Sequence, residues 1–272
     1  MSDLFRTIEI SDPADERDCL RIVSVKSRAL GRRGDVSLWI PRRERIGTLL
    51  ILLHGVYGSH WVWSQKGGVC GTAARLLDVG EIQPMVIAMP SDGLQRDGSG
   101  YLTWPGAEDV ERWIIEEVPA IARIAAPALL PDARVTIAGL SMGGYGALRL
   151  GAKYPERFCA ISAHSAITNL AELSSFVEEP ASDYLACATE EELSASYWTG
   201  ENRSRLPPIH FDCGIEDPLL SANRKLHLDL LEQEVKHTYT EFPGNHEWSY
   251  WRRHLAATLR FVDRHSHLKE NL

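Results

Sequence analysis

The chain has 272 residues and a formal net charge of -8, from 29 lysines and arginines and 37 aspartates and glutamates. Hydrophobic residues make up 44% and charged residues 24%, an ordinary globular composition that excludes disordered, collagen-like and coiled-coil proteins. Nucleic acid and anionic membranes attract basic proteins, so neither is expected as a partner of this mildly acidic chain. The five cysteines are scattered without a C-x-x-C pair, which argues against a disulfide framework and a zinc site.

The first residues contain no cationic segment followed by an apolar one, so no secretory signal is expected. The longest aliphatic run, residues 49–53, is far shorter than the roughly 20 residues that span a bilayer. We therefore expect a soluble, reduced, cytoplasmic protein.

Short aliphatic runs alternate with helical stretches along most of the chain, which is typical of a mostly parallel sheet flanked by helices. The beginning differs, because two runs around a glycine-containing turn indicate antiparallel strands. The expected strands are residues 20–25, 36–41, 48–53, 85–89, 134–138, 158–163, 209–213 and 239–242. The expected helices are residues 108–125, kinked at Pro119, 142–153, a helix capped by Ser221 that runs to residue 235, and 248–264. Residues 169–207 fit no sheet period and are expected to form an insertion above the sheet.

The sharpest motif is G-x-S-x-G at residues 139–143, directly after an expected strand and directly before an expected helix. In that context a serine occupies a tight strand-to-helix turn. The two glycines leave room where neighbouring elements come close, and the helix N-terminus favours negative charge that develops at Ser141. We predict that Ser141 is a nucleophile. The alternative, a glycine-rich turn needed only for packing, would leave this serine without a purpose.

A serine hydroxyl needs a base to accept its proton, and that base needs a third group to orient it. After a serine on such a turn, the acid and then the histidine are expected at the carboxyl ends of parallel strands. Three acids compete for the orienting role: Asp212 lies within an expected strand, and Glu216 and Asp217 lie in the loop after it. We favour Asp217, because a loop residue can reach across to a histidine ring. The alternative is that Asp217 only caps the following turn.

Of the ten histidines, His246 follows Asp217 in the expected order, in a loop that Gly244 allows to turn. We predict that His246 is the base. His164 and His210 lie near strand ends and could line the site, whereas His54 is expected to have a structural role. No H-x-x-x-H pattern or Asp/His cluster occurs at metal-site spacing, so no metal is expected.

An acyl-transfer site also needs backbone N–H donors for the tetrahedral oxyanion. We expect one from Met142, directly after the nucleophile, and the other from Val56, in the loop after residues 48–53. Four aromatic residues are candidates for substrate contact: Tyr57, Tyr101, Trp104 and Trp198.

Four sequence blocks in this order resemble the putative esterase family: ILLHG at 51–55, GLSMGGYGA at 139–147, DCGIED at 212–217 and HEWSYW at 246–251. That family includes tributyrin esterases, S-formylglutathione hydrolase (esterase D) and carbohydrate-acetyl or feruloyl esterases. The resemblance implies an α/β-hydrolase fold and carboxylic-ester hydrolysis through Ser141, Asp217 and His246. It also implies oxyanion amides from the His54 loop and Met142. The loop at 91–97 departs from the Tyr/Trp cluster that the family often carries there, and no glutathione-specific pattern is visible.

We therefore predict an α/β protein with the α/β-hydrolase fold: a mostly parallel central sheet flanked by helices, antiparallel N-terminal strands and a small insertion over the active site. One domain is expected over residues 1–272, with the cap-like insertion at 169–207. The predicted function is that of a serine carboxylesterase, which hydrolyses small-molecule esters of small acyl groups without a cofactor. Three alternatives stay open: an acyltransferase with the same triad, a peptidase, which is less favoured, and a non-catalytic binding module. The substrate ester and a homodimeric state are also left open.

Overall fold

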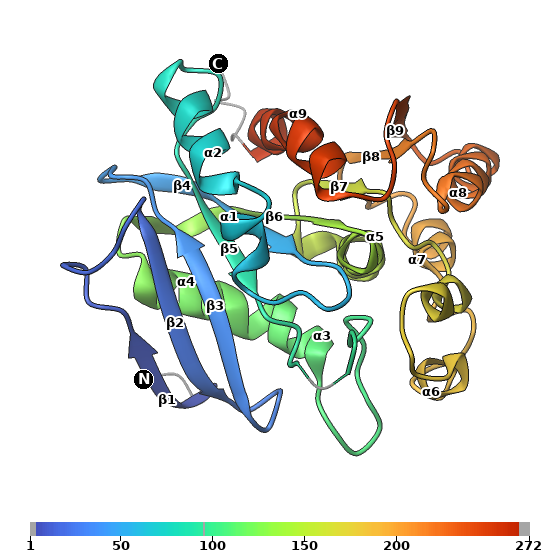
Figure 1. Cartoon of the computed structure of the whole chain (residues 1–272), viewed down its shortest axis with the longest axis horizontal. Helices are drawn as coiled ribbons and strands as arrows, with labels where there is room; N and C mark the ends of the chain where they lie inside the picture. Colours follow the sequence, from blue (N-terminus) through green and yellow to red (C-terminus); the bar gives the residue numbers. More distant parts are fainter. Residues whose placement is uncertain (1–3, 95, 267–272) are drawn as a thin grey trace.

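A nine-stranded sheet forms the centre of the protein, in the order β1-β2-β3-β5-β4-β6-β7-β8-β9 (Figure 1). The structure is a computed structural model that describes residues 4–94 and 96–266. Strand β1 pairs antiparallel with β2, β2 with β3, and β3 with β5. The remaining neighbours in the sheet, from β5 through β4, β6, β7 and β8 to β9, pair parallel. The strands are β1 (Phe5–Ile10), β2 (Leu20–Ser27), β3 (Arg33–Trp39), β4 (Ile46–Leu53), β5 (Met85–Pro90), β6 (Leu129–Leu140), β7 (Ile161–His164), β8 (Ile209–Gly214) and β9 (His237–Phe242).

Helices cover both faces of this sheet, α2 and α9 on one face and α4, α5 and α8 on the other (Figure 1). The α-helices are α1 (Val62–Gln65), α2 (Val69–Asp78), α3 (Val110–Arg112), α4 (Val118–Ala125), α5 (Met142–Lys153), α6 (Ala181–Leu185), α7 (Ala195–Glu201), α8 (Leu220–Glu232) and α9 (Trp248–Ser266). The described residues also form one π-helical turn, η1 (Trp113–Glu117), and two 3-10 helices, η2 (Pro155–Arg157) and η3 (Leu170–Ser175). No helix in the described part of the chain is long and apolar enough to cross a membrane.

The central strand β4 shows why the continuous apolar runs form buried strands. Successive side chains of a strand point to opposite faces, so a strand covered on both sides must be apolar at every position. Leu49 and Leu53 pack in the core beneath α4 and α5, and Leu50 and Leu52 pack in the core beneath α2 and α9. All four are at most 1% exposed, as the sequence predicts.

Three local predictions need correction. Strand β1 was not expected, and it pairs along β2 at the edge of the sheet. The helix expected over 108–125 is interrupted by the π-helical turn η1 just before Pro119. Because proline has no N–H, the carbonyl of Ile115 loses its usual partner, and the backbone rearranges there. Helix α8 begins at Leu220, so Ser221 lies inside it rather than capping it.

The loops that follow the parallel strands lie at one end of the sheet, beyond the carboxyl ends of these strands. The loops after β4, β5, β6, β8 and β9 carry the residues discussed below, because the carboxyl ends of parallel strands all lie on the same side. Between β7 and β8 the chain forms η3, α6 and α7, and α7 packs beside α5 (Figure 1). We call residues 169–207, which contain these elements, the insertion.

Candidate active site

Ser141 lies between the last residue of β6 and the first residue of α5, as predicted. Its backbone has φ 53° and ψ -120°, a region that residues with a side chain avoid. The flanking glycines allow this turn, because a Cβ on Gly139 would lie 2.2 Å from the carbonyl oxygen of Gly143. A Cβ on Gly143 would lie 2.5 Å from the carbonyl oxygen of Leu53. Any larger residue would therefore push the helix away from the sheet.

The side chains of Ser141, His246 and Asp217 form one hydrogen-bonded chain. The hydroxyl oxygen of Ser141 lies 3.0 Å from Nε2 of His246. Nδ1 of the same ring lies 2.9 and 3.1 Å from the two carboxylate oxygens of Asp217. Because a carboxylate only accepts hydrogen bonds, Nδ1 of the neutral ring carries the proton and Nε2 accepts from the serine hydroxyl. This arrangement can move the hydroxyl proton onto the imidazole.

The loops after β8 and β9 meet closely enough to join Asp217 to His246. A Cβ on Gly214 would lie 2.2 Å from the carbonyl oxygen of Gly244, so the two loops touch through glycine backbone. The Gly244 N–H donates to the Glu216 carboxylate at 2.5 Å. Asp217 also accepts the N–H of Leu219 at 2.8 Å, just before α8. Asp217 therefore caps the turn and also contacts the histidine, so its role is not limited to the cap.

The three competing acids have three different contacts. Asp217 binds His246 and Glu216 binds the backbone of Gly244, as described above. Asp212, within β8, instead lies 2.8 Å from Nδ1 of His164 and accepts the Tyr250 hydroxyl at 2.7 Å. Position in the strand explains the difference, because the Asp212 side chain is directed into the sheet–helix core rather than toward the loops.

His164 is part of a second, fully buried hydrogen-bonded chain. Its Nε2 lies 2.8 Å from the Thr258 hydroxyl, which lies 3.1 Å from the Ser162 hydroxyl, and Ser162 lies 3.1 Å from Nδ1 of His210. Burial alone would raise the pKa of Asp212, but the field and hydrogen bond of His164 outweigh it and leave that pKa below its usual value. Burial lowers the pKa of His210 to about 4. The two histidines that could have lined the site thus lie in the core.

The two residues expected to supply the oxyanion donors, Val56 and Met142, have side chains that pack against the same glycine. Met142 is the first residue of α5, where backbone N–H groups have no partner inside the helix. Within residues 4–94 and 96–266, the Val56 N–H also donates to no backbone or side-chain acceptor. A Cβ on Gly98 would lie 2.4 Å from the sulfur of Met142 and 3.2 Å from Cγ1 of Val56, so the side chains of both residues pack against Gly98.

The four aromatic residues expected to contact substrate have different positions. Tyr101 is fully buried, and its hydroxyl accepts the N–H of His54 at 3.0 Å and donates to the His54 carbonyl at 2.9 Å. Its indicated role is therefore support of the loop after β4, which corrects the expectation of substrate contact.

Trp104 and Trp198 are half-buried, and each indole N–H has a backbone partner. The Trp104 indole donates to the Ser99 carbonyl at 3.0 Å, and the Trp198 indole donates to the Glu192 carbonyl at 2.8 Å. Tyr57, by contrast, is 64% exposed and directly follows Val56. Substrate contact by Tyr57, Trp104 and Trp198 therefore stays a prediction, and Tyr57 is the most exposed of the four residues.

Phe176, in the insertion, was not singled out by the sequence. Its ring lies 5.0 Å from the ring of His246, and Trp251 of α9 packs edge-on against the same imidazole, also at 5.0 Å. These two contacts hold the imidazole on two sides. No sequence signal pointed to Phe176, because it lies far from His246 along the chain and in no motif.

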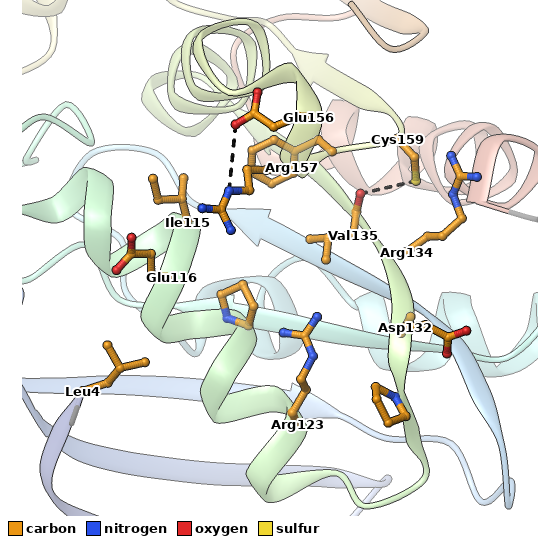
Figure 2. Close-up of a pocket in the computed structure, with 14 residues that line it drawn as sticks. Leu4, Ile115, Glu116, Arg123, Asp132, Arg134, Val135, Glu156, Arg157 and Cys159 are labelled. Carbon is orange, nitrogen blue, oxygen red and sulfur yellow. Dashed lines mark hydrogen bonds and ion pairs between the residues drawn. The ribbon is translucent and has the colours of Figure 1, made fainter. Parts of the chain in front are cut away.

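A large hollow of about 670 Å³ lies away from this site (Figure 2). Its lining includes Arg123 of α4, Asp132 and Arg134 near the start of β6, and Cys159 just before β7. It therefore opens at the amino ends of these strands, opposite Ser141. In the described part of the chain, no group of three or more His, Cys, Asp or Glu side chains could hold a metal ion.

Comparison with known proteins identifies related esterases. The model of the family described as putative esterase matches residues 27–262. An acetyl esterase of Caldicellulosiruptor saccharolyticus is 25% identical over 231 residues, 79% of this chain and 83% of that protein. A solved ferulic acid esterase has a TM-score of 0.74 and 26% identity, over 96% of this chain and 99% of that one.

A solved S-formylglutathione hydrolase from Agrobacterium tumefaciens has a TM-score of 0.75 over 97% of this chain and 100% of that one. Its identity is 16%, so this likeness concerns the fold. The family model spans most of the chain and includes the segments that carry Ser141, Asp217 and His246. The chain therefore belongs to the putative esterase family, whose members are serine hydrolases that act on ester bonds, and it has the α/β-hydrolase fold.

Proposed function

We propose that this esterase hydrolyses small acyl esters through an acyl-enzyme on Ser141, with His246 as the base and Asp217 as the group that orients it. The observation that carries the proposal is the continuous chain from Asp217 through both ring nitrogens of His246 to the hydroxyl of Ser141. A serine hydroxyl becomes a useful nucleophile only when such a base accepts its proton.

In the first step, the oxygen of Ser141 attacks the ester carbonyl carbon while its proton moves to Nε2 of His246. The carbonyl oxygen becomes an oxyanion, which the N–H groups of Val56 and Met142 stabilise by hydrogen bonds. Asp217 stabilises the imidazolium and holds its Nδ1 proton in place. The intermediate then collapses: the carbon–oxygen bond to the alcohol breaks, and His246 returns its proton to the leaving oxygen.

In the second step, a water molecule attacks the acyl-enzyme and His246 accepts a proton from that water. Collapse of the second intermediate breaks the bond to Ser141, which regains its proton from His246. A carboxylic acid is released and the enzyme returns to its starting state. These steps require no cofactor or metal ion.

Limited access to the nucleophile favours small acyl groups. Ser141 is only 2% exposed, and Phe176 of the insertion packs on the histidine beside it. The acetyl esterase relative supports the same substrate class. The net charge of -8 favours an uncharged small-molecule ester over nucleic acid or an anionic membrane as partner.

The decisive test compares Ser141→Ala with the wild type on p-nitrophenyl acetate. We expect kcat to fall about 10⁵-fold or more, because both steps pass through the Ser141 oxygen. Ser174→Ala is a matched control, since that exposed hydroxyl only donates to the Ala171 carbonyl, and it should retain wild-type kcat. Activity retained in Ser141→Ala, with an unchanged circular dichroism spectrum, would contradict the proposal.

A further inference from the structure

Asp97 lies where three segments of the chain meet. It is a half-buried residue of the loop after β5, and four hydrogen bonds converge on it. Its carbonyl accepts the Tyr57 N–H at 2.7 Å, and one carboxylate oxygen accepts the Tyr57 hydroxyl at 3.0 Å. The same oxygen accepts the Glu178 N–H at 2.8 Å, and the Asp97 N–H donates to the Glu179 carboxylate at 3.0 Å. No motif of the sequence singles out this residue.

We propose that Asp97 is a positioning residue that fixes the oxyanion loop, residues 54–58, and couples it to the insertion. The proposal rests on the proposed function, in which the Val56 N–H binds the oxyanion. Asp97 touches no reacting atom in this scheme. It acts through Tyr57, the residue that follows Val56.

The conformation of the oxyanion loop explains why it needs such a contact. Tyr57 has φ +55°, in the left-handed region that a side chain makes unfavourable. A loop in this state persists only if its surroundings hold it there. The Tyr101 hydroxyl holds one end of the loop through both backbone groups of His54, and Asp97 holds the other end through Tyr57. Val56 lies between these two attachments.

The same short segment also contacts the second oxyanion donor. Gly98, the next residue, packs against the side chains of Met142 and Val56, and the Gly100 N–H lies 3.4 Å from the Met142 sulfur. Residues 97–101 therefore support both sides of the oxyanion site. Displacement of Asp97 would change the distance between the two N–H donors, and this distance matters because oxyanion stabilisation depends on pre-set geometry.

The insertion is the third segment at this junction. Glu178 and Glu179 contact Asp97, and Phe176, two residues earlier, packs against the ring of His246. One stretch of the insertion thus contacts the base directly and the oxyanion loop through Asp97. A substrate bound against the insertion would therefore stabilise the positions of both His246 and the oxyanion loop.

The test measures kcat and KM on p-nitrophenyl acetate for four variants. Asp97→Ala should lower kcat about tenfold with little change in KM, less than the 10²–10³-fold cost of deleting an oxyanion donor. Asp97→Asn should retain wild-type kcat, because its amide oxygen can still accept from Tyr57 and Glu178. Tyr57→Phe keeps the ring, removes the hydroxyl that donates to Asp97, and should lower kcat about two- to threefold.

Asp183→Asn is the matched control. Arg96 and Asp183 form an ion pair at 3.1 Å between the same two segments without touching Tyr57, so this variant should keep wild-type kcat. The rate of fluorophosphonate labelling at Ser141 should fall with kcat in Asp97→Ala, because the phosphoryl oxygen uses the same donors.

Two results would overturn the positioning role while leaving the esterase intact. One is wild-type kcat in both Tyr57→Phe and Asp97→Ala. The other is a rise in KM alone, which would make Asp97 part of substrate binding instead. If the wild type itself shows no Ser141-dependent turnover, the proposed function and this inference both fail.

Discussion

The protein contains two Asp–His–hydroxyl chains of nearly equal geometry, and they differ in their surroundings. Asp217, His246 and Ser141 are joined by contacts of 2.9 and 3.0 Å. Asp212, His164 and Thr258 are joined by two contacts of 2.8 Å. The His246 side chain is 14% exposed, whereas those of His164 and Asp212 are fully buried.

Three features separate the chain at Ser141 from the chain at Thr258. Ser141 occupies a strained turn at the start of a helix, where the proposed mechanism requires two N–H donors, whereas Thr258 lies within the regular helix α9. The Thr258 hydroxyl also shares a hydrogen bond with Ser162, and Tyr250 donates to Asp212. The comparison teaches that an acid, an imidazole and a hydroxyl in sequence do not make a catalytic site. Access, backbone strain and oxyanion donors are also needed.

The largest expected contrast between the two chains comes from removing one carboxylate charge in each. Asp217→Asn should lower kcat about 10⁴-fold, because the amide favours the wrong tautomer of the catalytic histidine. The free energy of unfolding of Asp217→Asn should stay close to that of the wild type, since the Asn side chain can still accept the N–H of Leu219. Steady-state kinetics on p-nitrophenyl acetate measure the first effect, and urea unfolding measures the second.

Asp212→Asn is the matched variant in the buried chain, and it should show the reverse pattern. It should lower the free energy of unfolding by about 3 kcal/mol, because it breaks a buried, hydrogen-bonded pair. The kcat per folded molecule should stay within about threefold of the wild type. If Asp212→Asn lost activity as severely as Asp217→Asn at full folding, the separation of the two chains would be wrong.

Lowering the pH should lower the free energy of unfolding through His210, at one end of the buried hydrogen-bonded chain. Burial lowers the pKa of His210 to about 4, against about 6.5 in the unfolded chain. Between these values the unfolded state binds a proton that the folded state does not, so stability falls as the pH falls from 6.5 to 4. The contribution of this group is about 3 kcal/mol across that window.

Urea unfolding at several pH values between 7.5 and 4.5 checks this prediction. His210→Asn lacks the titrating ring, so its stability should decline less steeply with falling pH than that of the wild type. Parallel curves for the two proteins would show that His210 does not carry this dependence.

The smallest effect is expected for Thr258→Val, which keeps the shape of the side chain but removes the hydroxyl of the buried chain. His164 and Ser162 each lose one hydrogen bond, so the free energy of unfolding should fall by about 1–2 kcal/mol. The kcat should remain that of the wild type. A loss of activity comparable with that of Ser141→Ala would mean that the buried hydroxyl takes part in the reaction.

The sequence predicts the nucleophile turn because all of its requirements are local. A strand, two glycines around Ser141 and a helix follow one another within a few residues. The loops of Asp217 and His246 are also predictable, since parallel strands place their carboxyl ends together. The sequence contains no pattern that distinguishes Asp217 from Asp212 as the partner of His246. The two acids are five residues apart, and the path of the loop decides which one meets the histidine.

Contacts between distant segments could not be predicted in the same way. An aromatic residue such as Tyr101 is of a type that often contacts substrates. Its burial against His54, however, depends on how the loops after β4 and β5 pack. Asp97 and Phe176 belong to no motif, and their partners lie 40 or more residues away. Side-chain direction in these loops is set by tertiary packing, which single-sequence patterns do not encode.

The central claim is that Ser141, rather than any other hydroxyl of the protein, becomes acylated. The most direct measurement is intact-mass spectrometry with peptide mapping after rapid quenching of the reaction with a p-nitrophenyl ester, alongside fluorophosphonate labelling. We predict a single acyl or phosphonyl group on Ser141 in the wild type and none in Ser141→Ala. A label on Thr258, Ser162 or another residue, or turnover of the ester without any covalent adduct, would contradict this account.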